Sequence, residues 1–168
     1  MSQTKVATNF LGAGAVGQIV SVSKTDTFST SSTSYTDITG FTASITPQST
    51  SSKILVLSHW GWGSTAAPYP KFILLRGSTS INIGDSTGSA TQVSVANSYD
   101  GAGEGGLQGE PMFHHYLDSP SSASSTTYKW QVKSFNAART IVIGSTAETT
   151  DGNRLSFPTN ITLIELLQ

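Results

Sequence analysis

Residues 112–135, MFHHYLDSPSSASSTTYKWQVKSF, contain two stretches of alternating apolar and polar residues separated by a serine-rich loop. In the second stretch, Tyr128, Trp130 and Val132 fall on one side of an extended chain, and the residues between them are polar. This period of two is typical of a β-strand with one buried and one solvated face. Asp, Ser and Pro at positions 118–120 favour a turn. We therefore predict a β-hairpin here and expect the rest of the chain to be built in the same way.

Similar short stretches recur about every 8 to 12 residues, with Gly, Pro, Ser and Asp between them and no helical spacing. Residues 53–63, KILVLSHWGWG, are apolar on both faces at their start, which predicts a central strand covered on both sides. Residues 35–38 and 41–46 predict two short strands, and residues 71–83 predict a second hairpin that turns at residues 76–78. The pattern predicts a single all-β domain, an antiparallel, jelly-roll-like β-sandwich of about eight to ten strands. The expected core residues are Leu55, Leu57, Phe72, Leu74, Val93, Val95, Trp130 and Val132.

Composition narrows the class of partner. Charged residues make up only 11% of the 168 residues and the net charge is −1, whereas serine and threonine together make up about 30%. Scattered basic residues offer no positive stripe for phosphates, so we expect no nucleic-acid partner. No apolar stretch is long enough for a membrane span, and the start lacks the order of a signal peptide, so we expect no membrane insertion. The absence of cysteine is typical of a protein made in a reducing cytoplasm.

Residues 1–17, MSQTKVATNFLGAGAVG, mix small residues and glycines without a clear period. We predict that they form an extended N-terminal arm and that residues 18–168 form the sandwich. The glycines at 12, 14 and 17 have the spacing of a dinucleotide-binding loop, but a strand pattern follows where that loop needs a helix, so no cofactor is expected. Contacts with a partner would offset the entropy lost when the arm is ordered. The apolar anchors of the arm are Val6, Phe10, Leu11 and Val16.

Several stretches resemble one family of small β-domains. They are KTDTFSTSSTSYTDITG (24–40), SITPQSTSSKILV (44–56), FILLRGST (72–79), HHYLDSPSSASSTTYKWQVKS (114–134) and NITLIELLQ (160–168). Together they resemble the jelly-roll domains of tailed-bacteriophage virions, which occur in capsid-decorating proteins and in fibre heads, especially in phages of aquatic and cyanobacterial hosts. The likeness covers about residues 18–168, and its motifs mark strands and turns, none of them catalytic. It implies a homotrimer on the outside of a virion, made in the host cytoplasm.

Within this family we favour a capsid decoration protein, because no heptads or short repeats of a fibre shaft precede the sandwich. The arm would bind the major capsid protein. Three arms in a trimer would raise the overall affinity, because their weak individual contacts are linked. A tail-fibre or receptor-binding head domain is the alternative.

The closing strand, residues 160–168, is the expected place of the trimer contact. It is apolar on both faces, because Ile164 and Leu166 alternate with a second set of apolar residues. Each of the two apolar faces must be shielded from water. We expect the core to shield one face and a neighbouring subunit to shield the other. A central strand within one subunit would show the same pattern. The residues expected at the contact are Ile161, Leu163, Glu165 and Leu167.

Histidine offers one candidate for metal binding. His114 and His115 are adjacent in a strand, so their side chains point to opposite faces and cannot both bind one metal ion within a subunit. A site that takes one histidine from each of three subunits is an alternative, for which His59 is equally eligible.

Candidates for catalysis are poor, and we expect no enzyme. Serines abound, and residues 84–88, GDSTG, match the letters of the G-x-S-x-G motif, but no helical spacing follows them, as the nucleophile turn of a hydrolase requires. Glycan cleavage needs two carboxylates at a fixed separation, which glycine-rich loops do not provide. The acidic residues concerned are Asp100, Glu104, Glu110 and Asp118. Binding of a host surface glycan is a further alternative, although core packing is the more common use of such aromatic side chains. Its candidate stacking residues are Trp60, Trp62, Tyr69 and Trp130.

Overall fold

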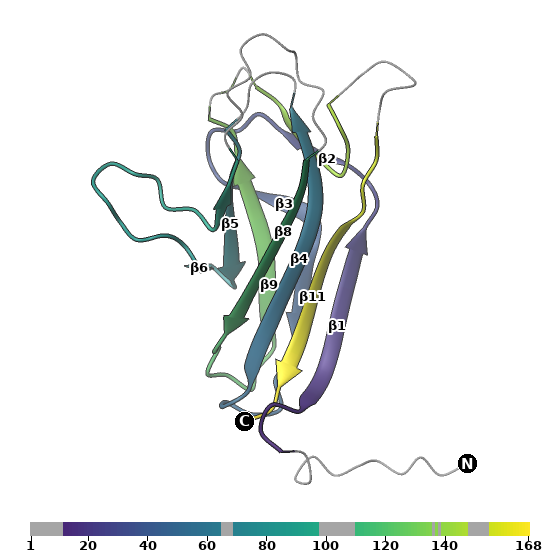
Figure 1. Ribbon diagram of the computed structural model, residues 1–168, viewed down its shortest axis with the longest axis vertical. Helices are drawn as coiled ribbons and strands as arrows, with labels where there is room; N and C mark the ends of the chain where they lie inside the picture. The colour runs from purple at the N-terminus through teal and green to yellow at the C-terminus, as the bar shows by residue number, and fades with distance from the viewer. Residues whose placement is uncertain (1–11, 65–68, 98–109, 136, 138, 148–154) are drawn as a thin grey trace.

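The computed structural model describes residues 12–64, 69–97, 110–135, 137, 139–147 and 155–168. Within these ranges the chain forms strands and no helix, and the strands make two antiparallel sheets (Figure 1). The first sheet contains β1 (Val16–Lys24), β2 (Phe28–Thr30), β4 (Lys53–Ser64), β8 (Glu110–Asp118), β10 (Ile141–Ile143) and β11 (Thr159–Leu166). The second contains β3 (Thr36–Ile45), β5 (Lys71–Arg76), β6 (Thr79–Ile81), β7 (Val95–Ala96) and β9 (Thr126–Lys133). The predicted all-β sandwich is confirmed.

β4 lies at the centre of the first sheet. It pairs with β11 along residues 53–59 and with β8 along residues 54–62. β1 extends the sheet beyond β11, so that β8, β4, β11 and β1 run side by side as four long strands (Figure 1). Every side chain on these four strands therefore points either into the sandwich or onto one shared outer face.

The core between the sheets is organised around aromatic residues. Trp60 packs against Phe41, Phe72 and Trp130, with ring centroids 5.6, 5.2 and 4.9 Å apart. The indole N–H of Trp130 donates to the hydroxyl of Ser58 on the opposite sheet at 2.9 Å. Rings of this size contribute most of the apolar area in a core, and the bond from Trp130 fixes how the two sheets face each other.

Half of the predicted core residues are confirmed, because Phe72, Leu74, Trp130 and Val132 are fully buried. Val93 and Val95 are half-buried. The prediction is wrong for Leu55 and Leu57, which lie on the outer face of β4, where Leu57 is 38% exposed. Both faces of β4 are apolar at its start, so alternation alone does not identify the inner one. Ile54 and Val56 face the core instead.

Residues 112–135 do not form the predicted hairpin. β8 pairs with β4 in the first sheet, whereas β9 pairs with β3 and β5 in the second. Residues 119–125 therefore cross from one sheet to the other. The two strands contribute to the core from opposite sides, and His114 of β8 meets Trp130 of β9 edge-on at 4.9 Å. Two amphipathic strands and a short loop suit a hairpin and a crossing equally well, and their alternation does not distinguish the two.

The hairpin predicted over residues 71–83 is confirmed, since β5 pairs with β6 across a turn in which Gly77 has a φ of 61°. The two strands predicted at residues 35–38 and 41–46 form the single strand β3. Its pairing with β9 shifts between Asp37 and Thr42, where Gly40 has a φ of 82°. The glycine allows this irregularity, because side chains disfavour that backbone conformation.

The boundary between arm and sandwich also needs correction. β1 begins at Val16, so Val16 and Gly17 belong to the first strand rather than to the arm. The turn before them is tied to the sandwich by the backbone N–H of Gly14, which donates to the carbonyl of Leu167 at 2.6 Å. The other predicted anchors, Val6, Phe10 and Leu11, lie outside the described residues.

Candidate interaction face

The outer face of the first sheet carries most of the exposed apolar side chains. Seven large apolar residues are exposed in the part of the chain that the structure describes, and five of them are on this face. They are Val16 (51% exposed), Ile19 (60%), Leu57 (38%), Phe113 (74%) and Leu117 (45%). A sheet face in contact with water normally carries polar residues. This face therefore has the composition of a surface that meets a partner.

Cross-strand register arranges the apolar residues in rows. Leu117, Leu55, Ile164 and Ile19 lie opposite one another on the four long strands. Opposite Cβ atoms are about 4.5 to 5.5 Å apart in such a sheet, so these side chains form a continuous row. Leu166 and Val16 lie opposite each other beside that row. We call these six residues, Val16, Ile19, Leu55, Leu117, Ile164 and Leu166, the apolar band.

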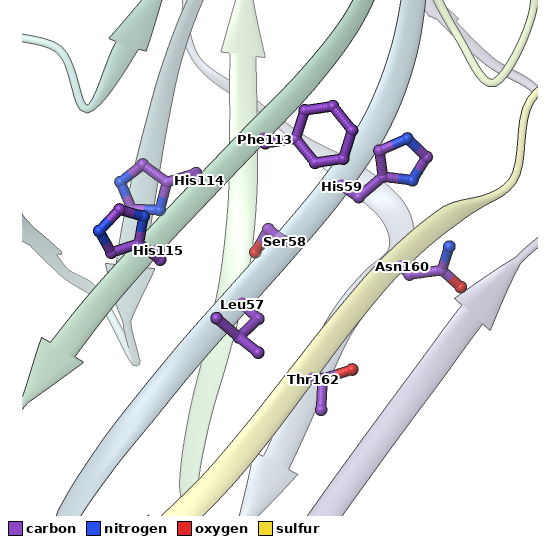
Figure 2. A pocket seen from close by; sticks show the side chains of 8 residues that line it. All are labelled: Leu57, Ser58, His59, Phe113, His114, His115, Asn160 and Thr162. Carbon is purple, nitrogen blue, oxygen red and sulfur yellow. The ribbon is translucent and has the colours of Figure 1, made fainter.

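Further along the strands the same face contains polar and aromatic groups. His115, Leu57 and Thr162 form one row, and Phe113, His59 and Asn160 form the next. Together with Ser58 and His114, these six residues line an open pocket of about 290 Å³, which we call the aromatic pocket (Figure 2). The rings of Phe113 and His59 lie together with their centroids 4.6 Å apart and their planes at 32°.

The end of the face beyond the pocket is covered. A Cβ on Gly61 would lie 2.6 Å from the ring of Phe157, so this glycine allows Phe157 to lie directly on β4. The ladder continues through Gly61 opposite Pro111. One side chain thus closes the face at this end, whereas the apolar band is at the other.

The outer face of the second sheet is different in character. Lys129 forms an ion pair with Asp37 at 2.8 Å, and Gln131 donates to the same carboxylate at 2.7 Å. These hydrogen bonds hold the pKa of Asp37 below its usual value. The hydroxyls of Ser44 and Thr127 also pair, at 2.8 Å. Polar groups on this face satisfy one another beside water, so the two outer faces of the sandwich are suited to different surroundings.

The four residues predicted at the trimer contact lie in the interior of one chain. Ile161, Leu163 and Glu165 are fully buried, and Leu167 is 9% exposed. They have no surface to offer to a second subunit, because β11 lies between β1 and β4 and turns these side chains into the core. The face of β11 that no other described strand covers is the one that carries Ile164 and Leu166.

Glu165 is buried because its carboxylate has partners. The side-chain amide of Gln18 donates to Oε2 at 2.7 Å, and the backbone N–H of Gln48 donates to Oε1 at 2.6 Å. Burial acts to raise the pKa of Glu165, but the hydrogen bonds outweigh it and hold the pKa below its usual value. Gly17 leaves room for this arrangement, since a Cβ there would lie 3.0 Å from Oε2.

The two adjacent histidines point to opposite faces, as predicted. His114 points inward, and its Nε2 lies 2.8 Å from the side-chain nitrogen of Asn82. Burial, with a smaller contribution from His115, lowers the pKa of His114 to about 4, so that the ring is neutral near pH 7. His115 lies on the outer face (Figure 2). Among the residues that the structure describes, no three His, Cys, Asp or Glu side chains are grouped to hold a metal ion.

Where the structure describes the side chains of the candidates for glycan cleavage and stacking, they are held in contacts within the fold. Asp118 is buried and bound to Arg76 and Tyr128, while Asp100 and Glu104 lie outside the described residues. The three tryptophans are buried, and Tyr69 packs against Phe135 with ring centroids 5.6 Å apart. Phe113 is the most exposed of the large apolar side chains on the first sheet, and it was not among the predicted site residues. Its alternation with His115 and Leu117 is the signal that identifies it.

Neither a scan against protein-family models nor a search of curated proteins finds a match to this chain. The part of the chain that the structure describes contains no helix with the length and apolarity needed to cross a membrane. The features that point to a function are the quoted sequence motifs and the two chemically distinct halves of the outer face of the first sheet.

Proposed function

We propose that this protein is a structural protein of a tailed-phage virion, a homotrimer on the capsid exterior that binds the major capsid protein through its N-terminal arm. The observation that carries the proposal is the apolar band on the outer face of the first sheet. The phage setting is supported by the resemblance of the motifs quoted above. Because the residues predicted at the trimer contact are buried within one chain, we propose that the contact uses the opposite face of β11, which carries Ile164 and Leu166.

The apolar band is suited to contact with a second copy of the chain. Apolar area removed from water stabilises an interface by about 25 cal/mol per Å². None of the six residues of the band is charged, and Lys53 lies opposite Leu166 at the edge of the band, so an apolar patch of the next subunit can meet the band without burying an unpaired charge. All six stand on paired strands, which hold them in place before binding and limit the entropy lost on association. In a cyclic trimer each band would meet a different patch of the next subunit.

Charge placed in the band should separate the subunits. Ile19 and Leu117 are 60% and 45% exposed, so replacing both by glutamate leaves the fold of one chain intact but buries charge at the contact. An unpaired buried charge costs about 3 to 5 kcal/mol, which is more than 100-fold in an association constant. Light scattering at micromolar concentration should give the mass of three chains for the wild type and of one chain for Ile19→Glu with Leu117→Glu.

A matched control places the same charges on the other outer face. Ser44 and Ser80 are exposed on the second sheet, and Ser44→Glu with Ser80→Glu should remain trimeric. A wild-type monomer, or a trimer that persists in the band variant, would count against this contact.

The arm should be dispensable for folding and required for binding to heads. Because β1 begins at Val16 and Gly14 is tied to Leu167, the truncation that tests the arm removes residues 1–11 rather than 1–17. The truncated protein should be a folded trimer that has lost binding to empty heads by about 100-fold or more, since three linked contacts are lost together. Sedimentation with purified heads measures this. Decoration by the truncated protein would contradict the capsid-binding role of the arm.

Copy number separates the capsid from the tail-fibre alternative. A decoration protein should appear at high stoichiometry on a denaturing gel of purified virions and should remain with tail-free heads. Recovery of the full-length chain only with purified tails would favour the fibre-head alternative.

A further inference from the structure

We propose that the aromatic pocket binds a neutral saccharide. This binding site goes beyond the structural role above and uses different residues from the apolar band. It lies on the same four-stranded face, beginning with the row of Leu57, next along the strands from the row of Leu55.

The ring of Phe113 provides the apolar wall of the pocket. It is 74% exposed, which is unusual for so large an apolar side chain on a sheet. The ring of His59 lies beside it on the neighbouring strand and limits its motion (Figure 2). An exposed, supported aromatic ring offers a flat apolar surface, on which the C–H face of a pyranose ring can pack.

Polar groups from two strands surround this ring. Asn160 and Thr162 project from β11, and His115 projects from β8 (Figure 2). The hydroxyl of Ser23 donates to the side-chain oxygen of Asn160, and the hydroxyls of Ser21 and Thr162 pair at 2.8 Å. These bonds orient the two side chains, and the amide of Asn160 carries two further N–H donors. A mixture of amide, hydroxyl and imidazole groups matches sugar hydroxyls, each of which donates and accepts.

The charge of the lining selects among ligand classes. Among the residues that the structure describes, no Lys, Arg, Asp or Glu lines the pocket, so a phosphate, sulfate or carboxylate would lose hydration without gaining a countercharge from them. The volume of about 290 Å³ is at the small end for ligand sites and suits one or two sugar rings. The pocket is open, so we expect millimolar affinity.

Binding can be tested on the full-length assembled protein by saturation-transfer difference NMR. The probes are glucose, galactose, mannose and N-acetylglucosamine, with glucuronate as the charged comparison. At least one neutral sugar should bind with a millimolar Kd, and glucuronate should bind at least tenfold more weakly than the neutral sugar. Phe113→Ala should weaken binding about tenfold, because it removes the stacking wall.

Phe135→Ala is the matched control, since Phe135 is also exposed, at 61%, but belongs to a different aromatic pair. It should leave sugar binding unchanged. The mass of each variant is measured in parallel, so that failure of the trimer and failure of sugar binding are read separately. Absence of binding by all four neutral sugars, equal weakening by both variants, or binding only to the monomeric band variant would overturn the proposal. The last result would mean that a neighbouring subunit occupies the pocket.

Discussion

Replacing Asp118 with alanine is expected to lower the free energy of unfolding by about 3 kcal/mol, because it breaks a largely buried ion pair by removing one partner. Asp118 is 3% exposed. Its two carboxylate oxygens accept from Nη1 of Arg76 at 2.8 and 2.9 Å, and Oδ2 also accepts from the hydroxyl of Tyr128 at 2.6 Å. The three groups come from β8, β5 and β9, so the cluster joins the two sheets at one end of the sandwich.

The size of this loss of stability depends on the two partners that Asp118→Ala leaves without their acceptor, Tyr128 and Arg76. Tyr128 is fully buried, and burial together with the hydrogen bond to Asp118 raises the pKa of Tyr128 above its usual range, so that the hydroxyl keeps its proton. Without Asp118 that hydroxyl loses its buried acceptor. The side chain of Arg76 is 31% exposed and keeps part of its hydration, which places the cost at the lower end of the range for broken buried pairs, about 3 to 5 kcal/mol.

Two variants provide the comparison for Asp118→Ala. Tyr128→Phe removes only the hydroxyl and should cost about 1 to 2 kcal/mol. Asp37→Ala breaks an ion pair whose aspartate side chain is 52% exposed, and it should cost less than about 1 kcal/mol. Urea unfolding at one protein concentration measures all three, because self-association would otherwise contribute. Equal losses for Asp118→Ala and Asp37→Ala would show that the buried cluster adds no stability beyond that of a surface pair.

The features of the fold that can be predicted from the sequence are those that depend on a single strand or turn. The alternation of Tyr128, Trp130 and Val132 identifies the inner face of β9, because its other face is polar. The opposite orientations of His114 and His115 follow from strand geometry alone. The turn at Gly77 is likewise local, since it depends on a backbone conformation that glycine adopts easily.

The sequence does not predict features that depend on a second strand. β4 and β11 are apolar on both faces, so Leu57 and Ile164 have the same local pattern as the buried Val56 and Leu163. Only the pairing of β4 between β8 and β11 decides which face turns inward. The same limit applies to the candidate site. The aromatic pocket joins residues from β4, β8 and β11 that are far apart in sequence, and their register is set by the assembled sheet.

Glu165 is misleading in sequence for a related reason. A carboxylate in an apolar strand normally marks a wet position, because charged groups are rarely buried without partners. Its partners, Gln18 and Gln48, come from β1 and from the loop between β3 and β4, and they reach Glu165 only when these segments meet β11 in the folded chain. Glu165 therefore lies on the inner face of β11, although a carboxylate normally indicates the outer face of a strand.

Glu165→Gln should lower the free energy of unfolding near neutral pH by about 2 kcal/mol, because hydrogen bonds to a charged acceptor are stronger than those to a neutral amide. The folded-state pKa of Glu165 is below its usual value, so its ionised form contributes stability above the unfolded-state pKa. That contribution is lost as the pH falls through the folded-state pKa. The difference between wild type and Glu165→Gln should therefore be constant above about pH 5 and shrink as the pH falls below about 4. Urea unfolding across this range, with Asp37→Ala as an exposed-carboxylate reference, measures the difference. A gap between wild type and Glu165→Gln that is independent of pH would mean that the charge on Glu165 does not stabilise the buried site.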